Sequence, residues 1–186
     1  MKFDRNFKPE LIVSKDPFRG ALNFVELDKA ENRLCATDGH RLVAVPVQVD
    51  EHDTSGPVDS KMLGEARKLA KSAKEDHAEI QCDGALKLTN GATAPRPDRA
   101  GMNFPAWRQI MSGVATKSLI AFNAKYLKEL AEAIGQEDYV VALAFDPEDP
   151  QVPIRVYGTT GFRGNVLAMS DDKAPIAILM PCHLKK

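Results

Sequence analysis

The strongest constraint on the fold of this chain is a repeated order of elements, in which a short strand leads into a helix and short strands follow. One helix is predicted over about residues 60–74, since Asp59 or Ser60 can cap it and apolar residues recur at three- and four-residue spacing. A second helix is predicted to begin after Asn123 and to end at Gly135. The expected inner faces are Met62, Leu63, Ala66, Leu69, Ala70 and Ala73, and Tyr126, Leu127, Leu130, Ala131 and Ile134.

Short strands are predicted around both helices as apolar runs bounded by turn residues. Asp38-Gly39 is a strong hairpin signal, and we expect it to bend the second arm of a hairpin made by residues 21–27 and 33–47. A short helix is expected within residues 8–15, because Pro9 suits a first helical turn. The other expected strands are Val58, 78–82, 85–88, 118–122, 139–145, 154–157, 165–168 and 176–180.

The elements divide into three similar modules at about residues 1–50, 57–112 and 117–184, the first of them abbreviated. Residues 51–56 are expected to form a loop or linker. Residues 146–153 contain three prolines, which exclude a central strand and predict a long hairpin loop. The pattern as a whole predicts an α+β fold.

Composition limits the classes of function. The net charge of −1 argues against a uniformly basic surface that wraps nucleic acid, so a DNA contact needs a local basic stripe. Three widely spaced cysteines (Cys35, Cys82 and Cys182) are typical of a reducing interior and not of a disulfide framework. The sequence shows neither a signal peptide nor an apolar run long enough to span a membrane, so the expected location is the cytoplasm.

Enzymatic chemistry has weak support in the sequence. Cys182 and His183 are neighbours on a predicted strand and point to opposite faces, so they do not form a working nucleophile–base pair. The cysteines and histidines never fall at the close spacing of a zinc site. Residues 158–161 lack the lysine of a phosphate loop and are typical of a turn. We therefore expect no enzyme, no metal and no cofactor.

Three motifs occur along the chain in a fixed order: ATDGHRL at residues 36–42, FPAWR at 104–108 and LMPCHL at 179–184. In this order they resemble the bacterial sliding clamp, the beta subunit of DNA polymerase III. The resemblance implies a DNA-clamp-like α+β fold of repeated strand-helix-strands modules, with the helices on one face of antiparallel sheets. It also implies two domains: residues 1–112 resemble the middle clamp domain, and residues 117–186 resemble the C-terminal half of the last one.

The resemblance implies a non-catalytic protein with a pocket for clamp-binding peptides of DNA polymerases or repair proteins. A Leu or Phe anchor of such a peptide needs an apolar slot with polar groups at its rim. Gln109 stands where the family has a second arginine, and Cys182-His183 replace a Met-Arg pair, which bears on peptide specificity. The implied pocket residues are Leu22, Thr37, Gly39, His40, Arg41, Leu42, Pro105, Ile110, Ile178, Met180, Pro181, Cys182, His183 and Leu184.

The helix at residues 60–74 carries a basic row. Arg67, Lys71 and Lys74 share one face, and Lys61 and Lys68 lie beside it. By the resemblance, this row would face the backbone of duplex DNA inside a ring, which four copies of this chain would complete. A solvated face is the alternative for the row. The leading hypothesis is a clamp-like accessory protein of replication or repair; the alternative is a monomeric peptide-binding adaptor without a ring.

Overall fold

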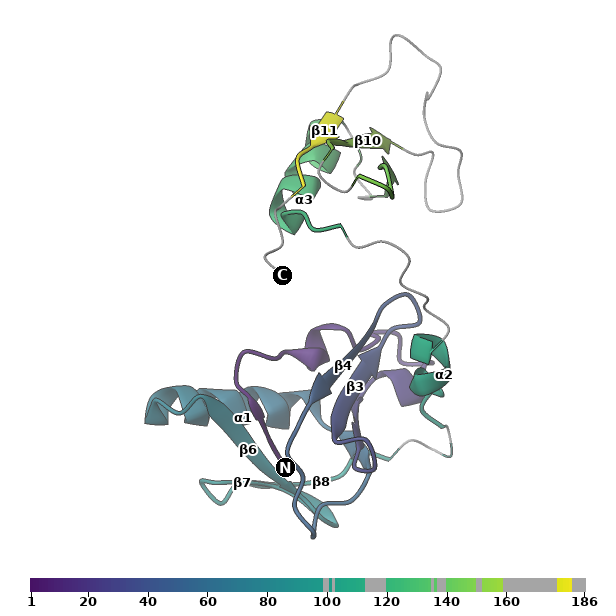
Figure 1. The fold of residues 1–186 in the computed structure, drawn as a ribbon. Coiled ribbons are helices and arrows are strands. Elements are labelled where there is room, and N and C mark those ends of the chain that lie inside the picture. The colour runs from purple at the N-terminus through teal and green to yellow at the C-terminus, as the bar shows by residue number, and fades with distance from the viewer. Residues whose placement is uncertain are drawn as a thin grey trace. The chain divides into compact units, whose positions relative to one another are not determined.

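The structure, a computed structural model, describes residues 1–98, 101, 103–112, 120–134, 136, 140–149, 152–158 and 177–181. The chain forms two compact units, Met1–Gly113 and Val114–Lys186, here called unit 1 and unit 2 (Figure 1). Both units combine antiparallel sheets with few helices, which confirms the expected α+β class.

The described residues of unit 1 form two four-stranded antiparallel sheets and four helices. Their order is β1 (Lys2–Asp4), the 3-10 helices η1 (Pro9–Leu11) and η2 (Gly20–Leu22), β2 (Val25–Asp28), β3 (Arg33–Thr37), β4 (Leu42–Pro46), β5 (Gly56–Val58), α1 (Ser60–Ala73), β6 (His77–Cys82), β7 (Ala85–Leu88), β8 (Thr93–Pro95) and α2 (Trp107–Ser112). One sheet has the order β4-β3-β2-β5, and the other has the order β1-β6-β7-β8.

The two modules of unit 1 exchange their first strands. β1 precedes η1 but pairs with β6 of the second module, with Phe3 opposite Ala78. β5 precedes α1 but pairs with β2 of the first module, with Val58 opposite Val25. Each module therefore completes the sheet of the other, and the two cannot separate without losing a strand from each sheet.

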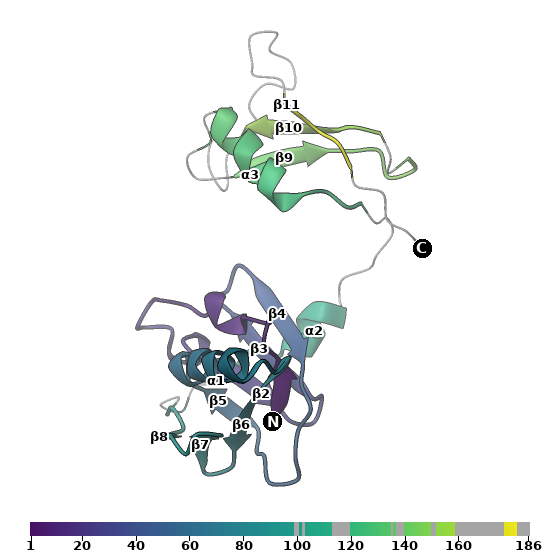
Figure 2. The ribbon, with the colours of Figure 1, turned by 90° about the vertical axis from the view of Figure 1, so that its left-hand side faces the viewer.

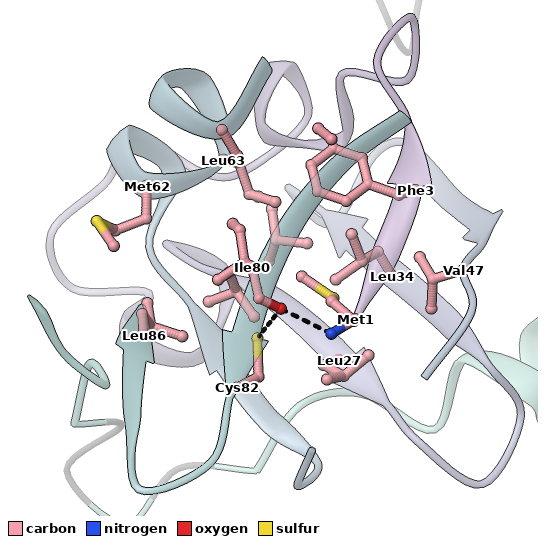
Figure 3. Close-up of a cluster of buried hydrophobic side chains, with 14 of the residues drawn as sticks. Met1, Phe3, Leu27, Leu34, Val47, Met62, Leu63, Ile80, Cys82 and Leu86 are labelled. Carbon is pink, nitrogen blue, oxygen red and sulfur yellow. Dashed lines mark hydrogen bonds between the residues drawn. The ribbon is translucent and has the colours of Figure 1, made fainter. Parts of the chain in front are cut away.

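A single core joins both modules of unit 1. α1 contributes Met62 and Leu63, which belong to one buried cluster with side chains from both sheets, such as Ile80 of β6 and Leu34 of β3 (Figure 3). The carboxylate of Asp59 caps the helix by accepting hydrogen bonds from the backbone N–H groups of residues 61 and 62, as the sequence predicts. The helix ends at Lys74, which adopts the left-handed conformation.

The N-terminal ammonium group of Met1 lies buried between the sheets. It donates a hydrogen bond to the carbonyl oxygen of Ile80 at 2.7 Å (Figure 3) and lies 2.6 Å from Oδ2 of the buried Asp53. The Asp53 carboxylate also accepts hydrogen bonds from the backbone N–H groups of Asp50 and Cys82. Burial raises the pKa of Asp53, but these hydrogen bonds outweigh it and hold the pKa below its ordinary value. The network ties β1 and β6 to the loop after β4.

The structure corrects the prediction for the first hairpin. Asp38-Gly39 does not bend one strand: it reverses the chain between β3 and β4, whose residues pair from Arg33 opposite Pro46 to Thr37 opposite Leu42. The first part of the expected strand 21–27 is also wrong, because η2 occupies residues 20–22. β1, β8 and α2 were not expected from the sequence.

The described residues of unit 2 form one helix and a three-stranded antiparallel sheet. The elements are α3 (Ala124–Ala133), β9 (Val141–Ala144), β10 (Ile154–Gly158) and β11 (Ala177–Leu179), and the sheet order is β11-β10-β9 (Figure 2). The side chain of Asn123 caps α3 at the backbone N–H of Lys125, as predicted. The described part of the β9–β10 loop contains no strand, as the prolines indicated.

Parts of the predicted pattern of unit 2 differ or are not described. Tyr126, which the sequence predicts on the inner face of the second helix, is 55% exposed. Residues 120–122 are not in a strand, although Ile120 and Phe122 pack against the core. The expected strand 165–168 and the expected helix end at Gly135 lie outside the described residues.

Candidate peptide-binding surfaces

The Asp38–Leu42 turn has a fixed shape. Asp38 Oδ1 accepts hydrogen bonds from the backbone N–H groups of His40 and Arg41, and Oδ2 accepts from Nη2 of Arg41 at 2.7 Å. The hydrogen bond from the Arg41 side chain is the main reason why the pKa of Asp38 lies well below its ordinary value. Thr37 is buried, and its hydroxyl oxygen accepts from the N–H of Gly39. The turn therefore presents His40 and Arg41 from a rigid frame.

A cavity of about 450 Å³ opens beside this turn. His40 and Arg41 line it on one side, and Arg19 donates to the Asp38 carbonyl at 2.7 Å. The other wall was not predicted from the sequence; it comes from the segment that runs from the end of η1 to the start of η2. The lining residues are Leu11, Val13, Ser14, Lys15, Asp16, Arg19, Asp38, His40 and Arg41. Leu22, Thr37, Gly39 and Leu42, also predicted for the pocket, do not line it.

The FPAWR segment builds a separate cavity of about 500 Å³ in unit 1, which Pro105 lines. Asp28 at the end of β2 anchors this segment: its carboxylate accepts from Trp107 Nε1 at 3.0 Å and lies 3.0 Å from Nη2 of Arg108. The Arg108 guanidinium also lies over the Trp107 ring. Ile110 is 55% exposed but does not line the cavity. This cavity and the one beside the Asp38–Leu42 turn share no lining residue.

Unit 2 carries the most apolar of these surfaces, a groove of about 560 Å³ between α3 and β11. Ile178, Met180 and Tyr126 line it, and each exposes more than half of its surface. The sequence predicted Ile178, Met180 and Pro181 but not the wall from α3. The lining residues are Tyr126, Glu129, Leu130, Ile178, Leu179, Met180 and Pro181. Cys182, His183 and Leu184 lie outside the described residues, and the convergence of surfaces from units 1 and 2 stays a prediction.

The basic row on α1 is shorter than expected. Arg67 is only 16% exposed: its guanidinium forms an ion pair with Glu10, which holds the η1 segment against the helix. Lys68 pairs with Glu65 at 2.7 Å. Within the part of the chain that the structure describes, Lys61, Lys71 and Lys74 are exposed and form no ion pair.

The buried cysteines are not poised as nucleophiles. Burial raises the pKa of the Cys35 thiol to about 12 and that of the Cys82 thiol to about 11, so neither is a thiolate at neutral pH. Across the described ranges, no group of three or more His, Cys, Asp or Glu side chains could hold a metal ion. No helix in those same ranges has the length and apolar character that crossing a membrane requires.

No model of a protein family matches the sequence, and no curated protein matches it. The fold does match solved structures. The DNA polymerase III beta subunit of Thermotoga maritima superimposes with a TM-score of 0.61 at 18% identity, over 97% of this chain and 49% of that chain. The sliding clamp of Caulobacter crescentus gives a TM-score of 0.59 at 18% identity, over 100% and 51%. The clamp of Bartonella birtlesii, bound to griselimycin, gives 0.58 at 15% identity, over 100% and 51%.

Identities this low establish the fold and leave the activity to be argued from the residues. Each of these clamps is about twice as long as this chain, of which nearly all is covered. The resemblance that the three motifs carry is confirmed at the level of structure: the chain has the fold of DNA polymerase III beta sliding clamps, at about half their length.

Proposed function

We propose that this chain is a clamp-like accessory protein of DNA replication or repair, which acts in the cytoplasm and binds short peptides of polymerases or repair proteins without catalysing a reaction. The observation that carries the proposal is the apolar groove of unit 2. The cavity beside the Asp38–Leu42 turn offers unit 1 a second, more polar surface for a peptide.

The chemistry of the groove suits an apolar peptide anchor. Exposed large apolar residues that gather in one hollow are typical of binding surfaces, whereas single ones are common on any protein. Met180 adapts to different anchors because its side chain is unbranched and polarisable. Glu129 and the Tyr126 hydroxyl provide polar groups at the rim. A Leu or Phe side chain of a bound peptide would fill the slot, with hydrogen bonds at its edge.

Truncating Met180 tests this proposal. We expect Met180→Ala to weaken the binding of a short fluorescent peptide that carries a Gln and a Leu-Phe pair. The loss of binding free energy should be about 1–3 kcal/mol, as for a hot-spot anchor, and fluorescence anisotropy measures it. Labelled griselimycin is a second probe, because the Bartonella clamp binds it. Val152→Ala is the matched control: it truncates an exposed apolar residue of the same unit that does not line the groove. Absence of binding of both probes by the unaltered chain would refute the proposal.

Encirclement of duplex DNA is a second candidate function, favoured by the charge of α1. Its exposed Lys61, Lys71 and Lys74 can attract phosphates without reading sequence, which sliding on DNA requires. α3 gives no such attraction, since Lys125 and Lys128 each lie 3.7 Å from a glutamate one turn later. The alternative is a monomeric peptide-binding adaptor, which keeps the groove but does not retain DNA. A DNA-binding measurement distinguishes the adaptor from the DNA-encircling protein.

A further inference from the structure

Unit 1 shows what lies beside the first strand after each helix. β2 follows the 3-10 helices η1 and η2, and β6 follows α1. Each pairs on one edge with the next strand of its own module and on the other edge with the first strand of the other module. Within this fold, then, that edge is covered by a strand delivered from a second module.

Unit 2 has the same order of elements with one strand missing from its described part. β9 follows α3 and pairs with β10, as β2 pairs with β3 and β6 with β7. Among the residues that the structure describes, no strand pairs with the other edge of β9. Residues 120–122 hold the position before the helix that β5 holds in unit 1, and they are not in a sheet.

The burial of side chains in the described part of unit 2 also indicates that the edge of β9 lacks a covering strand. All four residues of β9 are only half-buried, whereas β6 alternates exposed residues with fully buried ones. α3 has one buried residue, Ala131, while α1 has four. Leu127 and Leu130 of α3, and Ile134 at its C-cap, reach the core but stay partly exposed. Apolar surface that a complete pair of modules would cover is therefore open to solvent.

We propose that unit 2 is completed by unit 2 of a second copy of this chain, through exchange of the segments before α3. Residues 120–122 of each copy pair antiparallel with β9 of the other. The pairing of β5 with β2 sets the register: Phe122 precedes the helix cap as Val58 does, and Val58 lies opposite the first residue of β2. Phe122 then lies opposite Val141 of the second copy, and Ile120 lies opposite Leu143.

The chemistry of both segments favours a second copy as the occupant. Neither residues 120–122 nor β9 carries a charged side chain or a proline, the usual devices that keep an exposed strand edge from pairing. A two-fold contact lets each copy give one strand and receive one, so both edges are used and assembly stops at two copies. The inference does not depend on peptide binding, since the groove lies between α3 and β11, at the other edge of the sheet.

The mass of the full chain in solution is the first test. One copy has a mass of 20.4 kDa, and sedimentation equilibrium at micromolar concentration should give about twice that value. Hydrogen exchange of the amides in β9 should slow as the dimer forms and speed up on dilution. A monomer at all concentrations overturns the proposal, as does a dimer in which the exchange of β9 does not change with concentration.

Cross-linking between two variants that each carry one introduced cysteine tests the register. Ile120→Cys and Leu143→Cys are each made in a Cys182→Ser background, which keeps only the buried Cys35 and Cys82. The two variants are mixed under oxidised glutathione, and a disulfide between residues 120 and 143 then joins two different copies. Directly paired residues lie about 4.5–5.5 Å apart at Cα, which suits a disulfide. Ile120→Cys mixed with Val141→Cys is the control, two residues out of register, and should cross-link several-fold less. Equal or reversed yields, with both variants folded by circular dichroism, overturn the proposed pairing.

Discussion

At the scale of single residues, the buried ion pair between Met1 and Asp53 links distant parts of unit 1. Asp53 is 1% exposed, and its carboxylate joins the first residue of the chain, the loop after β4 and the end of β6. A buried pair of this kind contributes little net energy when intact, but removing one partner leaves an uncompensated charge in the core. The exchanged strand β1 should therefore lose its anchor when Asp53 is neutralised.

We expect Asp53→Asn to lower the free energy of unfolding by about 3–5 kcal/mol, because the amide cannot neutralise the buried ammonium. Urea denaturation followed by circular dichroism measures the change. Asp50→Asn is the matched control: the Asp50 carboxylate lies 3.8 Å from the same ammonium but is 75% exposed, so its loss should cost well under ~1 kcal/mol. Equal losses in the two variants would contradict a special role for the buried carboxylate.

The same carboxylate makes stability depend on pH. The pKa of Asp53 is lower in the folded chain than in the unfolded chain, so its contribution is complete above the unfolded value of about 3.9 and is lost as the pH falls through the folded pKa. Unfolding free energies measured between pH 6 and pH 2 should fall more steeply for the unaltered chain than for Asp53→Asn. Asp38 and Asp83, whose pKa values are also lowered, supply the slope that remains in the variant. Parallel curves would exclude the Asp53 contribution.

At the scale of elements, the sequence predicts best where the signal is local. Caps and apolar spacing locate α1 and α3 within a few residues, since Asp59 and Asn123 act on the next turn of backbone. β1 is not predicted because a strand of three residues, with one apolar residue between two charged ones, is too short to show a hydrophobic period. Its pairing partner also lies more than seventy residues away. Arg67 follows the same rule: its helical spacing suggests a solvated row, but tertiary contact with Glu10 decides its place.

Two glycines give opposite predictions. Gly39 has φ of +90°, and an added Cβ would lie 2.9 Å from Nη1 of Arg19, so Gly39→Ala should destabilise the chain by about 1–2 kcal/mol and disturb the turn that presents His40. Gly64 lies inside α1 with nothing within 4 Å of its added Cβ, so Gly64→Ala should stabilise by about 0.5–1 kcal/mol. Thermal unfolding of both variants measures the difference. A Gly39→Ala variant as stable as the unaltered chain would contradict the constraint that the positive φ places on this turn.

At the scale of the whole molecule, the three motifs predict the fold but not the way in which its modules complete one another. Strand exchange joins residues that are distant in sequence, such as Val25 and Val58, and no local pattern records it. Exchange of residues 120–122 between two copies would give a dimer of six modules. Each copy would contribute its own unit 1, and the two units 2 would form one joint domain. Two such dimers would contain the four copies expected for a ring.

The proposed DNA function rests on the exposed lysines of α1. Replacing Lys61, Lys71 and Lys74 with Glu should weaken binding to duplex DNA most strongly at low salt. The reason is that the variant neutralises fewer phosphates, so its binding releases fewer counterions from the DNA. Titrations of labelled duplex at several salt concentrations measure the affinity and its salt slope, which should become shallower by about 0.9 for each phosphate that the variant no longer neutralises.

The control for the α1 variant must carry the same change of net charge. Replacing Lys125, Lys128 and Arg155 with Glu meets this condition, and in the described structure both lysines already lie beside glutamates. If α1 faces the phosphates, this control variant keeps most of its affinity for duplex DNA. Its affinity should also depend more steeply on salt concentration than that of the α1 variant. If both variants lose affinity equally, the attraction comes from overall charge and not from α1. If the unaltered chain does not bind linear or circular duplex at low salt, the DNA function is excluded, and the peptide-binding adaptor is the function that the groove supports.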